Sequence, residues 1–226
     1  MELSGKTVAV SGGNGGIGSA VVKALHQKGA IVYSLDLDGE IPNVIPGVHY
    51  LSVDLTSSSQ LKHAIKDIKT KVDIVFLNAG IMRRGTIFDS SEEDYDLLFN
   101  SNLKTAWMLL KYLKPLMAEN AMIVQMSSGH ALNPEADPGI YTLTKKATAA
   151  LAEIVATTCP DYDVKVVYPG PVLTNLLLTG RNDQDKERIG KIAIKPPYFA
   201  EKVIELMESD KKTLKFVPKD SSYELS

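Results

Sequence analysis

Short apolar runs alternate with amphipathic stretches along most of the chain. The runs are rich in β-branched residues and end in glycine, proline or polar residues, which is typical of β-strands. Between the runs, apolar residues recur at helical spacing, so that Ile17, Val21 and Leu25 would share one face of a helix. The predicted strands are residues 6–12, 30–36, 49–54, 72–80, 121–128, 164–170 and 213–218. The predicted helices are residues 17–29, 57–68, 90–117, 141–157 and 198–209.

The alternation of strands and helices predicts the fold class. Strand–helix–strand units are right-handed crossovers that build a parallel sheet with helices on both faces. The nearly continuous apolar stretch 72–80 suits a strand that is covered on both faces. We therefore expect an α/β protein with a single-domain, doubly wound Rossmann fold over residues 1–226 and a parallel sheet of about seven strands. Residues 173–195 show no clean periodicity, and we expect a short substrate loop around residues 173–196.

Composition narrows the class of partner. The 226 residues are 44% hydrophobic and 23% charged, which is typical of a globular chain, and the formal net charge is −2. Because no Lys/Arg block stands out, we expect no nucleic-acid binding. Because no apolar run approaches the ~18 residues of a bilayer span, we expect no membrane association. The single cysteine, Cys159, and an N-terminus without a signal-peptide pattern favour a cytoplasmic protein.

Five glycines fall within residues 12–18, between the first predicted strand and the first predicted helix. Backbone without Cβ atoms can approach a pyrophosphate, and the helix N-terminus supplies N–H groups and a partial positive charge. An ordinary turn needs only one glycine, and a P-loop needs a lysine where Ser19 stands. The loop therefore predicts a dinucleotide site with two open registers, G-x-G-x-x-G from Gly13 or G-x-x-x-G-x-G from Gly12.

An acidic residue at the end of the second predicted strand bears on the choice of cofactor. Asp36 follows Gly18 by about the distance expected of an acid that binds the adenosine ribose hydroxyls. Its carboxylate would repel a 2′-phosphate, and no Arg or Lys occurs between Lys28 and Lys62 to attract one. We therefore expect NAD rather than NADP. Asp38, close behind, is more typical of a turn aspartate.

Two Y-x-x-x-K motifs are candidates for the chemistry of hydride transfer. A tyrosine can act as the base for an alcohol if its pKa falls from ~10 toward neutrality, and a lysine one helical turn away can supply part of that shift. The chain holds two such pairs, Tyr141/Lys145 and Tyr198/Lys202. Position favours the first pair, because Ser128 lies 13 residues before Tyr141 at the end of a predicted strand, where open α/β sheets bind ligands. We expect Tyr198 to pack at the surface.

Further motifs lie along residues 5–175. They are "SGGNGGIG", "VDLT", "LNAG", "YPGPVLTN", the helix asparagine Asn102, and the spacing of Ser128, Tyr141 and Lys145. Together these motifs resemble those of the short-chain dehydrogenase/reductase family, whose patterns include T-G-x-x-x-G-x-G, N-N-A-G and P-G-x-V-x-T. Two positions differ, because serine replaces the threonine of the glycine motif and Leu77 replaces the first asparagine of N-N-A-G.

The resemblance implies an oxidoreductase that transfers a hydride between NAD(H) and a small alcohol or ketone substrate. It implies that Tyr141 is the acid/base and that Lys145 lowers its pKa and binds the nicotinamide ribose. It implies that Ser128 holds the substrate oxygen and that Asn102 helps to hold a water that relays protons.

The resemblance also favours one register of the glycine loop. Gly12 would make the turn, Gly16 would allow approach to the pyrophosphate and Gly18 would pack helix against strand, which leaves Gly13 and Gly15 at variable positions. The residues expected to bind the cofactor are Gly12, Asn14, Gly16, Ile17, Gly18, Asp36, Asp54, Leu55, Asn78, Ala79, Gly80, Tyr141, Lys145, Pro169, Val172 and Thr174. No metal site is expected.

Several alternatives stay open. Ser127 could take the place of Ser128, and Asn100 could take the place of Asn102. A protein of the same fold could bind a dinucleotide as a sensor or scaffold without catalysis. Such proteins usually lose the tyrosine or the lysine, whereas all four catalytic positions are filled here.

Assembly is a further expectation. The helices around 92–117 and 141–157 could pair across a two-fold axis, and we expect a homodimer. A tetramer is in doubt, because the C-terminus lacks the glycine-rich ending that many family members use in tetramer contacts. The side chains suited to the pairing are Trp107, Met108 and Tyr112.

Overall fold

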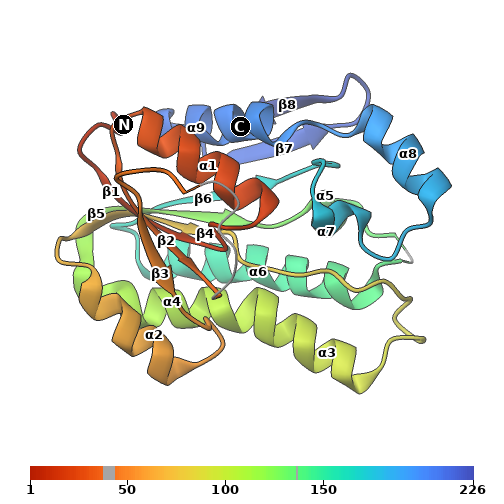
Figure 1. The fold of residues 1–226 in the computed structure, drawn as a ribbon, viewed down its shortest axis with the longest axis horizontal. Coiled ribbons are helices and arrows are strands. Elements are labelled where there is room, and N and C mark those ends of the chain that lie inside the picture. Colours follow the sequence, from red (N-terminus) through yellow and green to blue (C-terminus); the bar gives the residue numbers. More distant parts are fainter. Residues whose placement is uncertain (38–43, 136) are drawn as a thin grey trace.

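One mostly parallel sheet forms the centre of the structure, a computed structural model that describes residues 1–37, 44–135 and 137–226 (Figure 1). The strands are β1 (Thr7–Ser11), β2 (Ile31–Asp36), β3 (His49–Ser52), β4 (Val72–Leu77), β5 (Met117–Met126), β6 (Asp163–Tyr168), β7 (Thr213–Val217) and β8 (Ser222–Leu225). They lie in the order β3-β2-β1-β4-β5-β6-β7-β8. Neighbouring strands are parallel except for β7 and β8, which are antiparallel.

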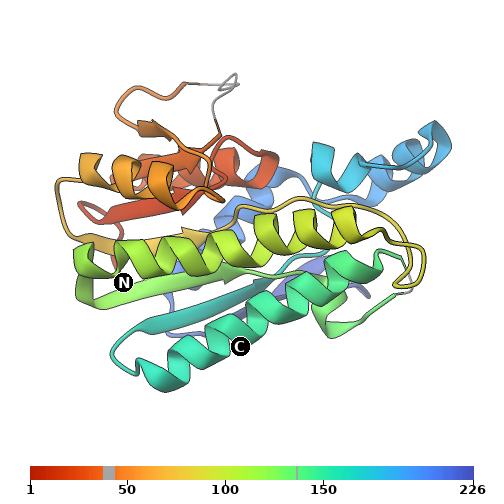
Figure 2. The same ribbon diagram turned by 90° about the horizontal axis from the view of Figure 1, so that it is seen from below.

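Helices cover both faces of the sheet. They are α1 (Gly16–Gln27), α2 (Ser58–Ala64), α3 (Glu92–Leu98), α4 (Thr105–Leu113), α5 (Gly129–Leu132), α6 (Gly139–Thr158), α7 (Asn175–Leu178), α8 (Asp183–Ile192) and α9 (Pro196–Glu208), with shorter turns η1 (Ile65–Asp67), η2 (Phe99–Lys104) and η3 (Lys114–Leu116). Helices α1 and α9 pack on one face, and α2, α4 and α6 pack on the other (Figure 1, Figure 2). None of the helices in the described ranges combines the length and the hydrophobicity that a bilayer span requires.

The period-two alternation of the strands explains the two cores. In β1, Ala9 packs with the side chains of α2, α4 and α6, whereas Val8 and Val10 pack with those of α1 and α9. All three side chains are fully buried. A strand buried on both faces is apolar along its length, which is why the centre of β1 (8–10) and most of β4 (74–77) are continuous apolar runs in the sequence.

The predicted doubly wound α/β fold is confirmed, with one correction to the strand count. The sheet has eight strands rather than about seven, because β8 pairs with β7 at the edge. This strand is four residues long and alternates buried Tyr223 with polar neighbours. So short an alternation is a weak sequence signal, and the ring of Tyr223 packs against Phe216 on the neighbouring strand and Phe199 on α9.

The long helix predicted over residues 90–117 is wrong in detail. The chain forms α3, a π-helical turn (η2), α4 and a short 3₁₀ turn (η3). A serine caps the first of these helices, because Ser91 Oγ accepts a hydrogen bond from Asp94 N at 3.1 Å. Apolar spacing shows which face of a helix is buried, but it does not distinguish a π-helical turn from α-helix. The irregular turn contains Asn102, whose contacts are described below.

The region expected to be a loop contains two helices. Helix α7 is a single turn, and α8 runs over Asp183–Ile192 with an Asn182 cap that accepts from Asp185 N at 2.9 Å. In α8 one side chain, Ile189, is buried. A helix with a single buried residue has no apolar stripe, so its period could not be seen in the sequence.

Candidate active site

The carboxyl ends of β1, β4, β5 and β6 meet at one edge of the sheet. The chain passes from β1 to β2 and β3 on one side and then crosses to β4 on the other. Open α/β sheets bind ligands at such a switch in strand order. A cavity of about 1090 Å³ opens at this edge, which is large compared with the range of about 300–1,000 Å³ that is usual for small-molecule sites.

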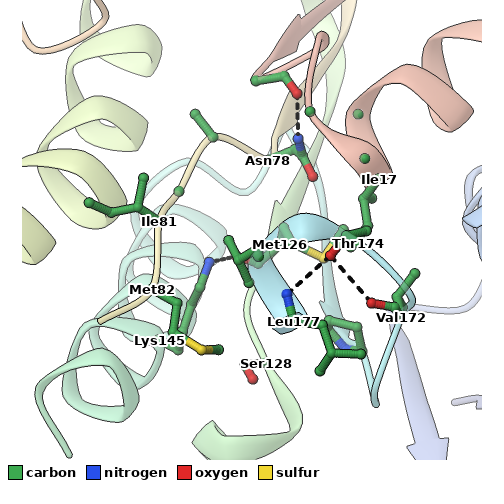
Figure 3. Close-up of a pocket in the computed structure, with 18 of the residues that line it drawn as sticks. Ile17, Asn78, Ile81, Met82, Met126, Ser128, Lys145, Val172, Thr174 and Leu177 are labelled. Carbon is green, nitrogen blue, oxygen red and sulfur yellow. Dashed lines mark hydrogen bonds between the residues drawn. The ribbon is translucent and has the colours of Figure 1, made fainter. Parts of the chain in front are cut away.

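The structure brings nearly all of the predicted site residues to this cavity. Figure 3 shows side chains from the glycine loop, the end of β4, α6 and the segment around α7 turned toward one space. The predicted residues that line it are Gly12, Asn14, Gly16, Ile17, Gly18, Asp36, Asp54, Leu55, Asn78, Ala79, Gly80, Ser128, Tyr141, Lys145, Pro169, Val172 and Thr174. Asn102 lies behind this lining and is 1% exposed.

Three glycines of the loop occupy positions where a side chain would collide with another segment. Gly12 leaves β1 with a φ of +68°, and a Cβ there would lie 2.8 Å from the Cα of Ala79. A Cβ on Gly16 would lie 2.6 Å from Cγ2 of Thr174, and one on Gly18 would overlap the carbonyl oxygen of Gly12. The turn at Gly12 agrees with the register that starts at Gly12, whereas Gly18 belongs to both registers.

The two remaining glycines differ from each other. At Gly15, the nearest atom to an added Cβ is the carbonyl oxygen of Gly12 at 3.3 Å, which suits a variable position. At Gly13, an added Cβ would overlap the hydroxyl of Ser34, a buried residue of β2. The loop therefore packs against β2 at Gly13, and the assignment of Gly13 as a variable position of the cofactor loop stays a prediction.

Asp36 closes the glycine loop at the end of β2. Its Oδ2 accepts a hydrogen bond from Asn14 N at 2.8 Å, and its Oδ1 accepts one from Leu37 N at 2.8 Å. The carboxylate is thus fixed beside the loop and lines the cavity. Asp38 lies outside the described residues.

The ends of β1 and β4 are joined by a pair of polar side chains. Asn78 Nδ2 donates to the carbonyl oxygens of Ser11 and Gly12, at 3.1 and 3.0 Å. Ser11 Oγ accepts from the backbone N–H groups of Asn78 and Ala79, at 3.0 and 3.1 Å. The sequence analysis placed Ser11 in the glycine motif but not among the expected site residues, although it holds the loop after β4 against the glycine loop.

Two further predicted residues are engaged in local turns. Asp54 Oδ1 accepts from the backbone N–H and the hydroxyl of Thr56, at 2.8 and 2.7 Å. Thr174 Oγ1 donates to the carbonyl oxygen of Val172 and accepts from Leu177 N, both at 3.3 Å (Figure 3). Thr174 therefore caps α7 and orients the wall of the cavity next to Gly16.

The two serines at the end of β5 are distinguished by their hydrogen bonds. Ser127 Oγ donates to the carbonyl oxygen of Lys145 at 2.8 Å, so its hydroxyl is used to hold α6. Ser128 accepts from His130 N at a long 3.3 Å, lines the cavity, and is near enough to Tyr141 to lower its pKa. Ser128 is thus the serine whose hydroxyl faces the tyrosine side of the cavity.

Tyr141 lies in the first turns of α6 and is 5% exposed. Burial raises the pKa of Tyr141 to about 12, and the neighbouring Ser128 acts in the opposite direction. The expected lowering of the tyrosine pKa toward neutrality is therefore not seen in this arrangement, and burial is the cause. The His130 ring lies edge-on to the Tyr141 ring, with 6.2 Å between their centroids.

Lys145 lies one helical turn further along α6. It is 5% exposed, its Nζ is 5.7 Å from the centroid of the Tyr141 ring, and its Nζ donates to the carbonyl oxygen of Met126 at 3.5 Å (Figure 3). Burial lowers the pKa of Lys145 to about 8. A value above 7 leaves the ammonium mostly protonated at neutral pH, close to the tyrosine.

Asn102 connects the π-helical turn to two other segments. Its Oδ1 accepts from Ile81 N at 2.7 Å, and its Nδ2 donates to the carbonyl oxygen of Ile81 at 3.1 Å and to Thr144 Oγ1 at 2.9 Å. Thr144 follows Tyr141 in α6 and donates its hydroxyl proton to the Tyr141 carbonyl at 2.7 Å. Asn102 therefore fixes both the loop after β4 and the helix that carries the tyrosine.

The fold and the cavity define a dinucleotide-binding α/β protein, and comparison of the sequence gives its family. Residues 6–185 match the family described as short chain dehydrogenase, so the chain belongs to this family of oxidoreductases. It is 30% identical to the oxidoreductase UcpA of Escherichia coli (strain K12) over 207 residues, which cover 83% of this chain and 78% of the relative. It is 28% identical to dehydrogenase/reductase SDR family member 6 of Aquarana catesbeiana over 181 residues, which cover 76% and 74% of the two chains.

Solved structures agree on the fold. A short chain dehydrogenase family protein from Francisella tularensis subsp. tularensis SCHU S4 matches with a TM-score of 0.81 and 26% identity, over 92% of each chain. A short chain dehydrogenase from Burkholderia cenocepacia J2315 in complex with NADP matches with a TM-score of 0.82 and 20% identity, over 94% of this chain and 88% of that one. One from Burkholderia phymatum in complex with NAD matches with a TM-score of 0.80 and 20% identity, over 92% and 87%.

Proposed function

We propose that the protein transfers a hydride between NAD(H) and a small alcohol or carbonyl substrate. One observation carries the proposal: Ser128, Tyr141 and Lys145 line the same cavity as the glycine loop and Asp36. A proton donor and a dinucleotide cradle that share one surface are the parts that such a reaction needs. The family membership supports the same class of chemistry.

The residues of the cavity suit a nicotinamide dinucleotide. The glycine loop leads into the N-terminus of α1, which would hold the pyrophosphate. Asp36 would hold the adenosine ribose, and Val172 and Thr174 would hold the nicotinamide end. The cofactor, when bound, supplies or accepts the hydride.

The protein's own side chains would manage the proton. In the reduction direction the substrate oxygen needs a proton, and Tyr141, with a pKa of about 12, carries one at neutral pH. Ser128 would donate a second hydrogen bond to the same oxygen. Lys145 stays positively charged near neutral pH and would stabilise the tyrosinate that remains after proton transfer.

A turnover assay tests this function. NADH oxidation is followed by absorbance with a panel of small aldehydes and ketones, and NADH binding is measured separately by fluorescence. We expect NADH binding together with turnover of at least one carbonyl compound. Tight NADH binding without turnover across the panel would instead favour the sensor or scaffold alternative.

The preference for NAD rests on Asp36. The solved relatives include one with NADP and one with NAD, so they support a nicotinamide dinucleotide without choosing between the two. A fixed carboxylate beside the glycine loop would repel a 2′-phosphate. We expect wild-type kcat/KM to favour NADH over NADPH by at least about tenfold, since one opposed charge is worth about 1–2 kcal/mol in a partly exposed site.

Asp36→Asn removes the charge and keeps an acceptor for Asn14, so it should shift the NADH/NADPH ratio toward NADPH by about tenfold. The matched control is Asp54→Asn, in the same cavity, which should leave the ratio unchanged. The measurement is kcat/KM with each cofactor. A wild-type enzyme that prefers NADPH would contradict the assignment of Asp36.

We also propose a homodimer, with an interface that differs from the one expected from the sequence. Met108 is 2% exposed and packs in the core of its own chain, so it is not available for pairing. Trp107 on α4 and Ile154 on α6 are 47% and 60% exposed, and the two helices run side by side on one face (Figure 2). Light scattering after gel filtration measures the assembly.

A further inference from the structure

Three arginines lie around the segment that follows β6, at the side of the cavity where α7 and α8 are found. Arg181 and Arg188 line the cavity itself. Arg84, from the loop after β4, donates from its Nε to the carbonyl oxygen of Thr179 at 3.2 Å and so contacts the same segment. Sequence reasoning gave no reason to single out Arg181.

Two of these arginines are neutralised by acids of their own. Arg84 Nη1 pairs with Asp137 Oδ2 at 2.9 Å, and Arg188 Nη2 pairs with Asp185 Oδ1 at 3.2 Å. Arg84 therefore ties the loop after β4 to the segment before α6, and Arg188 is largely exposed on α8. Neither guanidinium needs a ligand.

Arg181 is different. Within the part of the chain that the structure describes its side chain forms no ion pair, and its one side-chain hydrogen bond runs from Nε to the carbonyl oxygen of Leu177 at 3.1 Å. It is partly buried, and burial and the charge of Arg84 lower its pKa, whereas the more distant carboxylates of Asp185 and Asp137 act in the opposite direction. A guanidinium remains charged in proteins, and a partly desolvated charge without an ion-pair partner in contact is unfavourable. An anion at this position would remove that cost.

The position of Arg181 relates it to the reacting group. Arg181 and Tyr141 line the same cavity, and so does His130, whose ring lies edge-on to the Tyr141 ring. A substrate held at Tyr141 would therefore share its cavity with the guanidinium of Arg181. The same cavity is lined by the apolar side chains Leu132, Leu176, Leu177 and Ile189.

We infer that Arg181 binds a carboxylate of the substrate, so that the substrates are small oxo acids and the corresponding hydroxy acids. The guanidinium offers the planar pair of donors that a carboxylate accepts. The leucines suit a short hydrocarbon chain between the carboxylate and the carbonyl group of the substrate. Glu135 also lines the cavity, but it is exposed to water, whereas Arg181 is partly buried. The charge in the cavity that lacks full hydration is therefore the positive charge of Arg181. This inference rests on the proposed function and specifies its substrate class.

The test compares each oxo acid with its uncharged methyl ester. Pyruvate, acetoacetate and levulinate are reduced with NADH beside their methyl esters, in wild-type protein and in Arg181→Gln. We expect at least one acid to exceed its ester in kcat/KM by about 10- to 100-fold, the range for a hydrogen bond to a charged group. Arg181→Gln should abolish that advantage through KM, with ester turnover and NADH affinity unchanged.

Arg83→Gln is the matched control. Arg83 lies on the loop after β4, its side chain is 52% exposed, and it approaches Asp94 at a loose 3.9 Å. This substitution should leave the preference for the acid intact. A wild-type protein that prefers the esters, or an Arg181→Gln protein that keeps the preference for the acid, would overturn the inference while leaving the proposed function in place.

A binding measurement separates the inference about Arg181 from the proposed function. Wild-type protein saturated with NADH is titrated with butanoate and with butanamide, and the change in NADH fluorescence is followed. Tighter binding of the carboxylate, lost in Arg181→Gln, supports the inference even if none of the carbonyl compounds is turned over. Equal binding of the two compounds overturns it, and failure of NADH itself to bind counts against the proposed function.

Discussion

The chain carries the same local motif twice, and the two copies differ in nearly everything except their own geometry. The lysine Nζ lies 5.7 Å from the tyrosine ring centroid in Tyr141/Lys145 and 5.6 Å in Tyr198/Lys202. Tyr141 is 5% exposed at the edge of the sheet, whereas Tyr198 is 41% exposed in the first turn of α9. The i,i+4 spacing alone sets the distance, so the distance carries no information about function.

The surroundings give the two lysines opposite properties. Burial lowers the pKa of Lys145 to about 8. Lys202 is held by a hydrogen-bonded ion pair with Glu205 at 2.9 Å, and that contact raises its pKa. A candidate catalytic pair is therefore recognised by what the rest of the fold places around it, here Ser128 and the cavity, rather than by the motif itself.

The largest expected difference between the two copies is in turnover. Tyr141→Phe removes the hydroxyl that would carry the proton and keeps the ring, so kcat should fall by about 10²–10⁴-fold, the usual contribution of a general acid or base. NADH affinity should stay within a few-fold. Steady-state kinetics and NADH fluorescence measure the two quantities.

Tyr198→Phe is the matched substitution in the other copy, and its kinetics should equal those of the wild type. If Tyr141→Phe keeps more than about a tenth of the activity, or if Tyr198→Phe is the inactive protein, the choice between the two motifs is wrong.

The second difference concerns stability and its dependence on pH. A lysine with a pKa of about 8 in the folded state and 10.5 in the unfolded state leaves the unfolded state with more bound protons between these values. The wild-type free energy of unfolding should therefore contain a component that rises with pH from about 8 to 10.5. Lys145→Met removes this component and should stabilise the protein at pH 7 by up to about 3 kcal/mol, since each pKa unit is worth about 1.4 kcal/mol.

Urea unfolding of wild type and Lys145→Met at several pH values checks the slope. The gap in stability should narrow as pH rises from 8 toward 10, below the range in which Tyr141 ionises. A gap that stays constant with pH would show that methionine stabilises by packing alone, and the low lysine pKa would then be rejected.

Much of the fold and the site could be predicted from the sequence because the signals are local. Apolar runs gave the parallel strands, since a strand buried on both faces is apolar throughout. The glycine loop and Asp36 lie at the ends of the first two strands, and parallel strands bring such ends to one edge. That edge also receives Ser128, which is why the distance of 13 residues to Tyr141 was informative.

The remainder depends on contacts between distant segments. Gly13 is constrained by Ser34 on the neighbouring strand, and the π-helical turn at Asn102 is linked to Ile81 and Thr144. Whether Arg181 has an ion-pair partner depends on which acids pair with the other arginines. None of these contacts leaves a periodic trace in the sequence. Strand β8 was missed for another reason, because it pairs locally with β7 but is only four residues long.

The smallest expected effect comes from Lys202→Met, and its sign should be opposite to that of Lys145→Met. Glu205 raises the pKa of Lys202, so the pair stabilises the folded state at neutral pH and loses this effect as pH rises through the lysine pKa. The side chains are 24% and 49% exposed, so solvent screens the pair and the loss should be only about 0.3–0.5 kcal/mol. Urea unfolding at pH 7 should show this small destabilisation at low salt and none at high salt, with turnover unchanged. A Lys202→Met protein that gains stability, as Lys145→Met is expected to do, would mean that the two lysines share one environment, and the contrast between the two motifs would fail.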